Sequence, residues 1–284
     1  MDQRERFTGD QDLCHLSPEG FARFARYITN ELGIKMPDTK ASMIQSRLVR
    51  RVRELGMHSL DQYGEYLFST KCADELDHFV NAITTHKTDF FREPEHFTYL
   101  TEKAIPSLLG NRDGRLQRVH IWSAACSSGE EPYTLAMALS EYARCDYAIL
   151  ATDISSKVLE RAHQAIYAQS QTKPIPLALK RKYFLQSKNV TSGLLRIIPE
   201  LRERVSFHRL NLMDEDYRVK NHFDVIFLRN VLIYFDRDVQ KAVIGRLCRY
   251  LKPGGYLFVG HSESLVDMDI PVTRVEASVY RMSS

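Results

Sequence analysis

Two adjacent glutamates, Glu130 and Glu131, stand where a helix begins in the stretch VHIWSAACSSGEEPYTL (residues 119–135). The apolar run before the small-residue loop and Pro132 after the glutamates predict a strand, a loop and a helix. A helix N-terminus carries partial positive charge and free N–H groups, and dinucleotide-binding folds seat a pyrophosphate there. Two carboxylates would repel a pyrophosphate. They therefore indicate a ligand with a cationic group near this helix N-terminus, or they only stabilise the helix through its dipole.

Polar residues also follow two other apolar runs. Asp153 ends the run YAILATD, 24 positions after Gly129. A carboxylate there binds ribose hydroxyls in such folds, and the alternative is that Asp153 is the N-cap of the next helix. Arg229 and Asn230 end the run FDVIFL and are soon followed by Tyr234. Ligands bind at the carboxyl ends of parallel strands, so these residues are candidates for lining a pocket, whereas Arg229 alone would be more typical of a surface salt bridge.

Together the three sites favour S-adenosylmethionine as the ligand. This molecule has no phosphate, carries a sulfonium and an ammonium, and offers an adenosine whose ribose a carboxylate can bind. An NAD-dependent oxidoreductase is the rival enzyme class. The paired glutamates and the lack of a GxGxxG loop in this stretch of the sequence argue against it.

The elements that must position these residues fall into two parts. Residues 1–83 carry apolar side chains at helical spacing, which predicts a small all-helical N-terminal domain, and residues 84–95 are expected to be a linker that contributes to the cofactor site. Over residues 96–284 the predicted strands are 119–123, 147–151, 223–228 and 256–260, and the predicted helices are 132–143, 156–166 and 237–251. This alternation predicts an α/β domain with a parallel sheet wrapped by helices. The runs LLRII and VSFHRL predict a small antiparallel β insertion at about residues 181–210.

Composition excludes several classes of protein. The chain has 284 residues, of which 44% are hydrophobic and 26% charged, as in ordinary globular domains, and no apolar run is long enough for a membrane span. Its five cysteines are scattered and none stands at zinc-like spacing, so no metal site is predicted and a cytoplasmic location is expected. A net charge of +3 is too small to indicate a nucleic-acid partner.

A cluster of basic residues on the second predicted helix could bind a partner. Its members are Lys40, Arg47, Arg50, Arg51 and Arg53, and no acidic residue lies between the first and the last. Three interpretations remain open: a solvated face, a nucleic-acid surface, and a surface for an acidic protein helix. The lack of aromatic residues among these arginines weakens the nucleic-acid interpretation.

Five motifs, in this order, closely resemble the chemotaxis receptor methyltransferases: TTHKTDFFRE (84–93), WSAACSSGEEPY (122–133), ATDIS (151–155), NL (211–212) and FLRNVLIYF (227–235). The resemblance covers nearly the whole chain. It implies a small helical domain followed by a Rossmann-like class I methyltransferase domain with a small antiparallel β insertion. It also implies methyl transfer from S-adenosylmethionine, giving S-adenosylhomocysteine, to glutamate side chains on the cytoplasmic helices of chemoreceptors.

The resemblance also assigns residues of the cofactor site. It implies that Thr88 and Arg92 touch the cofactor and the reacting centre, and that Glu131 holds the methionine end. His86 stands where the family usually has an asparagine, and its imidazole can still donate one hydrogen bond to the cofactor.

Further along the chain, the resemblance implies that Asp153 binds the ribose and that Asn211 and Leu212 flank the adenine. Arg229 and Asn230 are implied to line the pocket beside Tyr234. The same resemblance has the basic helix facing the receptor and, in some members, the β insertion binding a C-terminal receptor tail peptide as an added strand.

The expected chemistry needs no strong general base. A glutamate with an ordinary pKa of about 4.3 is ionised at neutral pH. Arg92 and Tyr234 are the candidates for aligning this carboxylate, and catalysis should come mainly from positioning and from exclusion of water. A signalling adaptor that has lost transfer is the rival outside the enzymes. It would require damage at the site residues, which are present. The lone His261, after a predicted strand, is interpreted as structural.

Overall fold

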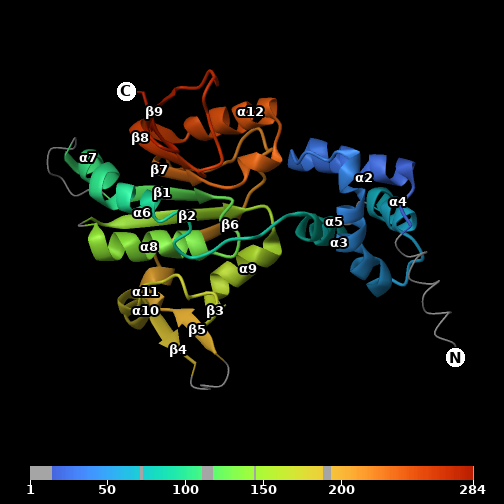
Figure 1. Cartoon of the computed structure of the whole chain (residues 1–284), viewed down its shortest axis with the longest axis horizontal. Helices are drawn as coiled ribbons and strands as arrows, with labels where there is room; N and C mark the ends of the chain where they lie inside the picture. The colour runs from blue at the N-terminus through green and yellow to red at the C-terminus, as the bar shows by residue number, and fades with distance from the viewer. Residues whose placement is uncertain (1–14, 71–72, 111–117, 144, 188–192, 284) are drawn as a thin grey trace. The chain divides into compact units, whose positions relative to one another are not determined.

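The computed structural model describes residues 15–70, 73–110, 118–143, 145–187 and 193–283 (Figure 1). Its contacts divide the chain into two compact units, Met1–Thr85 and His86–Ser284. The division falls inside the predicted linker 84–95, most of which belongs to the larger unit. Among the described helices, none is long and apolar enough to cross a membrane.

The described residues of the smaller unit form four α-helices, α2 (Pro18–Leu32), α3 (Ala41–Glu54), α4 (Leu60–Thr70) and α5 (Ala73–Ile83), with a short 3₁₀ turn at Asp38–Lys40. Helix α2 begins at Pro18 because the Ser17 hydroxyl accepts a hydrogen bond from the Gly20 N–H, 3.0 Å away. The apolar spacing that predicts these helices also builds their core. Phe24, which is fully buried, packs its ring against those of Tyr63 and Phe79.

A seven-stranded sheet forms the centre of the larger unit. Its strands, in spatial order, are β6 (Val205–Arg209), β2 (Tyr147–Asp153), β1 (Val119–Ala124), β7 (Phe223–Leu228), β8 (Leu251–Val259), β10 (Val279–Met282) and β9 (Val272–Glu276). The first five are parallel, and β10 is antiparallel to both its neighbours. From β1 the chain builds outward first to one side and then, from β7, to the other. The strand order therefore reverses between β1 and β7, which is where such folds bind ligands.

Helices follow the strands as the alternation of the sequence predicts. They are α8 (Glu130–Tyr142), α9 (Ser156–Gln164) and α12 (Arg237–Cys248), and a helical segment precedes β1: α6 (Glu95–Tyr99), a π-helical turn (Leu100–Ala104) and α7 (Ile105–Gly110). Helices α8 and α9 pack against β2 and β6. Strand β7 is buried at every residue, as a central parallel strand must be.

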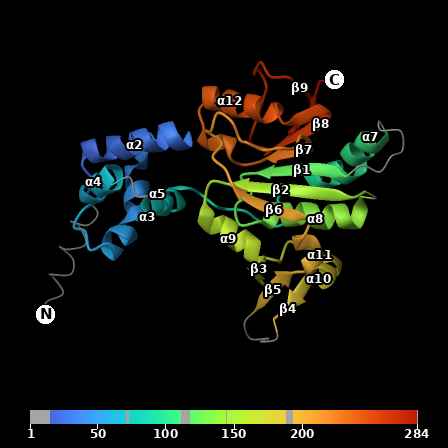
Figure 2. The ribbon, with the colours of Figure 1, turned by 180° about the vertical axis from the view of Figure 1, so that it is seen from behind.

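A separate three-stranded antiparallel sheet lies beside α8 and α9 in both views of the molecule (Figures 1 and 2). It consists of β3 (Ile166–Ala168), β5 (Leu194–Ile197) and β4 (Phe184–Gln186), accompanied by α10 (Leu177–Tyr183) and α11 (Pro199–Arg202).

The assignment of the run VSFHRL to this insertion was wrong. That run forms β6, which pairs in parallel with β2 in the main sheet, and the third strand of the small sheet is β3. Strand β6 lies at the edge of the main sheet and is largely exposed. Its sequence therefore alternates in the way that usually indicates an antiparallel strand.

Candidate functional site

The carboxyl ends of β1, β2, β7 and β8 meet at the point where the strand order reverses, and Glu131 lies there. One carboxylate oxygen, Oε1, accepts a hydrogen bond from the Ser123 hydroxyl at 2.7 Å, and Oε2 accepts one from Arg229 at 3.0 Å. The guanidinium of Arg229 also binds Glu93 Oε2 at 3.0 Å and lies over the ring of Phe97. We call Glu93, Glu131, Arg229 and Asn230 the switch-point cluster.

Glu93 is a member of the cluster that the sequence analysis missed. It follows Arg92 with a positive φ of 55°, and its Oε1 accepts a hydrogen bond from Asn230 Nδ2 at 3.1 Å. Burial acts to raise the pKa of Glu93, but the hydrogen bonds from Asn230 and Arg229 outweigh it, so the pKa lies below its usual value. The available signal was its place at the end of the TDFFRE motif.

The two adjacent glutamates have different surroundings. Glu130 is buried and its Oε2 accepts a hydrogen bond from the Ser128 hydroxyl at 2.7 Å, inside the loop. Burial raises the pKa of Glu130 and likewise that of Glu131. Only Glu131 is bonded to Arg229, so only this second carboxylate belongs to the cluster.

Gly129, which separates the loop from the glutamates, is required for packing. Its φ is +95°, and a Cβ there would lie 2.8 Å from the Tyr167 hydroxyl and 2.9 Å from Ala162 Cβ. The Tyr167 hydroxyl in turn donates to the Ser128 carbonyl at 2.8 Å. This glycine therefore lets β3 and α9 approach the loop, in contrast to the glycines that admit a pyrophosphate in dinucleotide folds.

Asp153, at the end of β2, is buried and holds two backbone groups. Its Oδ2 accepts from the Ser127 N–H at 2.9 Å and its Oδ1 from the Ser155 N–H at 3.0 Å. Ser155 is the N-cap of α9, so the N-cap alternative for Asp153 was wrong. Burial raises the pKa of Asp153, while these hydrogen bonds and the nearby His86 oppose the shift.

The loop after β6 lies beside Asp153, whose carbonyl accepts a hydrogen bond from the Leu210 N–H at 2.9 Å. Asn211 Oδ1 accepts from the Met213 N–H at 3.0 Å, which fixes the turn, and Leu212 is buried. The positions assigned to the adenine and to the ribose are therefore adjacent in the fold.

The TDFFR segment is tied to the same region by its backbone. The His86 carbonyl accepts from the Ser127 hydroxyl at 3.0 Å, and the Arg92 carbonyl accepts from Arg229. The guanidinium of Arg92 is partly exposed and donates to the Lys87 carbonyl at 3.1 Å. Thr88 is partly buried, and no hydrogen bond joins its side chain to the cluster in the part of the chain that the structure describes.

A second missed residue, Glu263, supports the end of β7. Its carboxylate accepts from the backbone N–H groups of Asn230 at 2.9 Å, Leu232 at 2.7 Å and Gly260 at 2.6 Å. Asn230 has a positive φ of 59°, a conformation that these hydrogen bonds stabilise. The same carboxylate thereby anchors the 3₁₀ turn Leu232–Tyr234, in which the Tyr234 side chain is partly exposed.

Comparison with known proteins decides what this arrangement is. A family model described as "CheR methyltransferase, SAM binding domain" matches residues 86–281, and one described as "CheR methyltransferase, all-alpha domain" matches residues 19–84. The chain belongs to the CheR methyltransferase family. This assignment confirms the predicted family and fold class, and it identifies an S-adenosylmethionine-dependent methyltransferase.

Relatives of this CheR methyltransferase cover almost the whole chain. The Escherichia coli (strain K12) "Chemotaxis protein methyltransferase" is 38% identical over 271 residues, which are 94% of this chain and 92% of the relative. The Pseudomonas aeruginosa "Chemotaxis protein methyltransferase 2" is 37% identical over 275 residues, 96% and 95% of the two chains. The Borreliella burgdorferi "Chemotaxis protein methyltransferase" is 36% identical over 257 residues, 88% and 90%.

The charges of the switch-point cluster fit S-adenosylmethionine. Two carboxylates, Glu93 and Glu131, share one guanidinium, that of Arg229, so the ionised cluster carries a net negative charge. An ammonium or sulfonium would offset this charge, whereas a pyrophosphate would add to it.

The basic helix of this CheR methyltransferase, α3, divides into bonded and exposed cations. Arg51 pairs with the buried Glu75 at 2.6 Å, and Glu75 also accepts from the Tyr63 hydroxyl at 2.8 Å. Arg47 donates to the carbonyls of Ile83 and Thr84 at the end of α5. Both side chains are therefore bonded within the helical unit.

The other cations of α3 and its N-cap are more accessible. Arg50 has 88% of its side chain exposed and pairs with Glu54 at 2.9 Å. Arg53 is exposed, and Lys40, which is partly buried, donates to the Lys35 carbonyl at 2.9 Å. These residues remain candidates for a partner surface.

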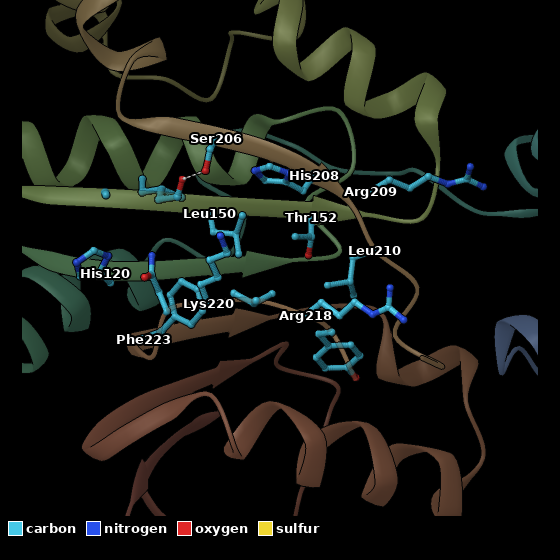
Figure 3. A pocket seen from close by; sticks show the side chains of 15 residues that line it. His120, Leu150, Thr152, Ser206, His208, Arg209, Leu210, Arg218, Lys220 and Phe223 are labelled. Carbon is cyan, nitrogen blue, oxygen red and sulfur yellow. Dashed lines mark hydrogen bonds between the residues drawn. The ribbon is translucent and has the colours of Figure 1, made fainter. Parts of the chain in front are cut away.

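A pocket of about 430 Å³ lies apart from the switch-point cluster, on the face formed by β1, β2 and β6 (Figure 3). Residues 210–222, which contain no helix, form its other wall. Figure 3 shows Leu150, His208 and Lys220 around it. Its lining includes none of the four residues of the cluster, so the cofactor assignment does not depend on it.

Proposed function

We propose that this CheR methyltransferase transfers methyl groups from S-adenosylmethionine to glutamate side chains on the cytoplasmic helices of chemotaxis receptors, producing methyl esters. The observation that carries the proposal is the bond between Glu131 and Arg229 at the switch point, within a chain whose relatives are named chemotaxis protein methyltransferases. Glu131 would hold the ammonium of the methionine part and Asp153 the ribose hydroxyls.

The acceptor is inferred from the fact that the protein does not have to supply a general base. S-adenosylmethionine provides an electrophilic methyl group, and a glutamate is already ionised at neutral pH. Neither the transfer nor the acceptor then requires a general base. A lysine acceptor, with an ordinary pKa near 10.4, would first have to lose a proton. Arg92 and Tyr234 can both donate hydrogen bonds to a carboxylate.

We assign Arg92 and Tyr234 to aligning the acceptor. The backbone of Arg92 is fixed by Arg229, while its guanidinium has only the Lys87 carbonyl as a partner among the described residues. It can therefore turn toward an incoming carboxylate without breaking an ion pair. A tight pairing would make the carboxylate less nucleophilic, so a mobile partner suits the role.

Two surfaces would recognise the receptor. The exposed cations Arg50 and Arg53, with Lys40, suit a helix rich in glutamate. The small sheet offers β4 at its edge, next to β5, where a receptor tail peptide could add a strand. Leu185 on β4 is half exposed and would contact such a peptide.

The product identifies the acceptor directly. The full-length protein is incubated with a chemoreceptor and S-adenosylmethionine carrying a labelled methyl group, and the labelled receptor is then treated with mild alkali. A glutamate methyl ester releases its label as volatile methanol, whereas an N-methyl group stays on the receptor. Label that survives the alkali would overturn the proposed acceptor, and an absence of label would overturn the proposed activity.

Removing the aligning groups should slow the transfer step. Tyr234→Phe and Arg92→Ala should lower kcat by about 10–100-fold, because the lost hydrogen bonds matter chiefly in the transition state. The Kd for S-adenosylmethionine, measured by calorimetry, should change by less than about threefold in Tyr234→Phe. A Tyr234→Phe variant with wild-type kcat would remove this residue from the mechanism.

A further inference from the structure

His96, on α6, is a buried histidine whose ring nitrogens make no hydrogen bond among the described residues. The residue is 2% exposed, and neither Nδ1 nor Nε2 makes a hydrogen bond in the described part of the chain. Buried polar atoms are nearly always hydrogen-bonded, because an unpaired one has lost its water and gained nothing in exchange. Both ring nitrogens of His96 are therefore available to bind a ligand.

Two metal-binding side chains surround this ring. Each of Glu93, His96 and His261 offers one ligand atom, and these three atoms all lie within 4.8 Å of one another. His96 Nδ1 is 3.5 Å from Glu93 Oε2, and the rings of His96 and His261 are 4.8 Å apart and nearly perpendicular. We propose that Glu93, His96 and His261 form a binding site for a divalent transition-metal ion of the zinc class.

The donor set determines the class of ion. Two imidazoles and one carboxylate are a recurrent set of zinc ligands, and with three protein ligands a fourth position stays open to water. A carboxylate-only site would favour magnesium or calcium, which the two imidazoles disfavour. The ligand atoms must approach by about 1 Å to reach coordinating distances, and His261, which is exposed, is free to make that movement.

Arg229 is the main electrostatic obstacle, since its guanidinium binds Glu93. However, the same guanidinium is shared with Glu131, so the two carboxylates leave an uncompensated negative charge beside the site. The exposure of His261 gives the ion a route from solvent.

Bound metal would connect two parts of the larger unit. Glu93 and His96 belong to the segment that carries Arg92, whereas His261 follows β8. A metal ion there would fix the segment of the aligning arginine to the sheet. Ligation of Glu93 would also compete with its hydrogen bond from Arg229, so the ion would act on the switch-point cluster through Glu93, which belongs to both sites.

Cobalt(II) provides a probe with a visible spectrum. The full-length protein is stripped with a chelator, its exposed thiols are blocked, and it is titrated with Co²⁺. Absorption bands of low-symmetry, four-coordinate cobalt should saturate at one equivalent and disappear when Zn²⁺ is added. The readout needs no methyl donor or receptor, so its failure is distinct from failure of the proposed function.

Matched variants assign the ligands. His261→Gln, an exposed position where folding should be preserved, should weaken Co²⁺ binding at least tenfold. His163→Gln, which changes an equally exposed histidine on α9, should leave the titration unchanged. Circular dichroism and S-adenosylmethionine binding would verify that both variants are folded. A wild-type protein without a saturable spectrum, or a His261→Gln spectrum identical to wild type, would overturn the proposal.

Discussion

At the scale of single residues, Glu130 and Glu131 show how position decides the role of a carboxylate. They are adjacent and both have a raised pKa because they are buried. Glu130 is bonded to the Ser128 hydroxyl within its own loop, whereas Glu131 reaches Arg229 from another strand. Of the two adjacent glutamates, only Glu131 therefore belongs to the switch-point cluster, because Glu130 supports the loop.

The raised pKa of Glu131 makes cofactor binding depend on pH. In the free protein this carboxyl takes up a proton at a pH above 4.5, the ordinary value. A bound ammonium favours the ionised form, so below the raised pKa binding must release a proton. Affinity for S-adenosylmethionine should therefore be constant between this raised pKa and the pKa of the ligand's own ammonium, and fall by up to about tenfold per pH unit once the Glu131 proton is bound.

Calorimetry in two buffers with different ionisation enthalpies would measure this proton release. Release should increase as the pH is lowered, and Glu131→Gln should reduce it. Part of the dependence should remain in that variant, because burial also raises the pKa of Asp153. An affinity that stays constant down to pH 4.5 would contradict the role given to Glu131.

At the scale of elements, the loop between β1 and α8 is stabilised by close packing around Gly129. In Gly129→Ala the new methyl group would collide with the Tyr167 hydroxyl and Ala162 Cβ at a φ of +95°. We expect a loss of about 1–3 kcal/mol in the free energy of unfolding. Thermal unfolding should show this as a fall in Tm of several degrees.

A second glycine supplies the control. Gly245 lies inside α12, and a Cβ there would meet no atom within 4 Å. Gly245→Ala should therefore leave stability unchanged or raise it by about 0.5–1 kcal/mol, because alanine is the better helix former. Equal effects of the two substitutions would show that packing around Gly129 is not the cause.

Long periodic elements could be predicted from the sequence, and irregular or edge elements could not. The range of β7 was predicted to the residue, because a central strand is apolar throughout. Strand β6 was assigned to the wrong sheet, because apolar and polar residues alternate along an exposed edge strand as they do along an antiparallel one. The hairpin of β9 and β10 was missed, and β9 is mostly exposed and carries little apolar signal.

The site followed the same pattern. Asp153 and Arg229 were found because they stand at the ends of apolar runs, and Glu131 because it stands where a helix begins. Glu93 and Glu263 were missed because their roles depend on contacts across many residues, such as the 136 positions between Glu93 and Arg229. No local pattern encodes such a contact.

At the scale of the whole molecule, the chain contains a helical unit and a catalytic unit, which can be tested separately. Charge reversal at Arg50 and Arg53 should lower kcat/KM for the receptor by about tenfold at low salt, since exposed charges act mainly on association. The loss should shrink as salt is added, and the Kd for S-adenosylmethionine should not change.

The same reversal elsewhere on the helical unit is the matched control. Arg23 and Arg26 are exposed on α2, so Arg23→Glu with Arg26→Glu changes the net charge equally. If both double variants lose receptor methylation equally, the effect is one of net charge and the α3 surface is not specific. Arg51 is unsuitable for this test, because its loss would leave Glu75 buried without its ionic partner and unfold the unit.

Strand β10 is inserted into the sheet out of chain order. It follows β9 along the chain, yet it lies between β8 and β9 and pairs with both. A nascent chain that has already formed its five parallel strands would still present the outer edge of β8 to solvent. That strand leads directly into Gly260 and the carboxylate of Glu263, which hold the end of β7. Until β10 has been synthesised, we expect this edge, which lies beside the groups that support the end of β7, to be open to chaperones or to aggregation.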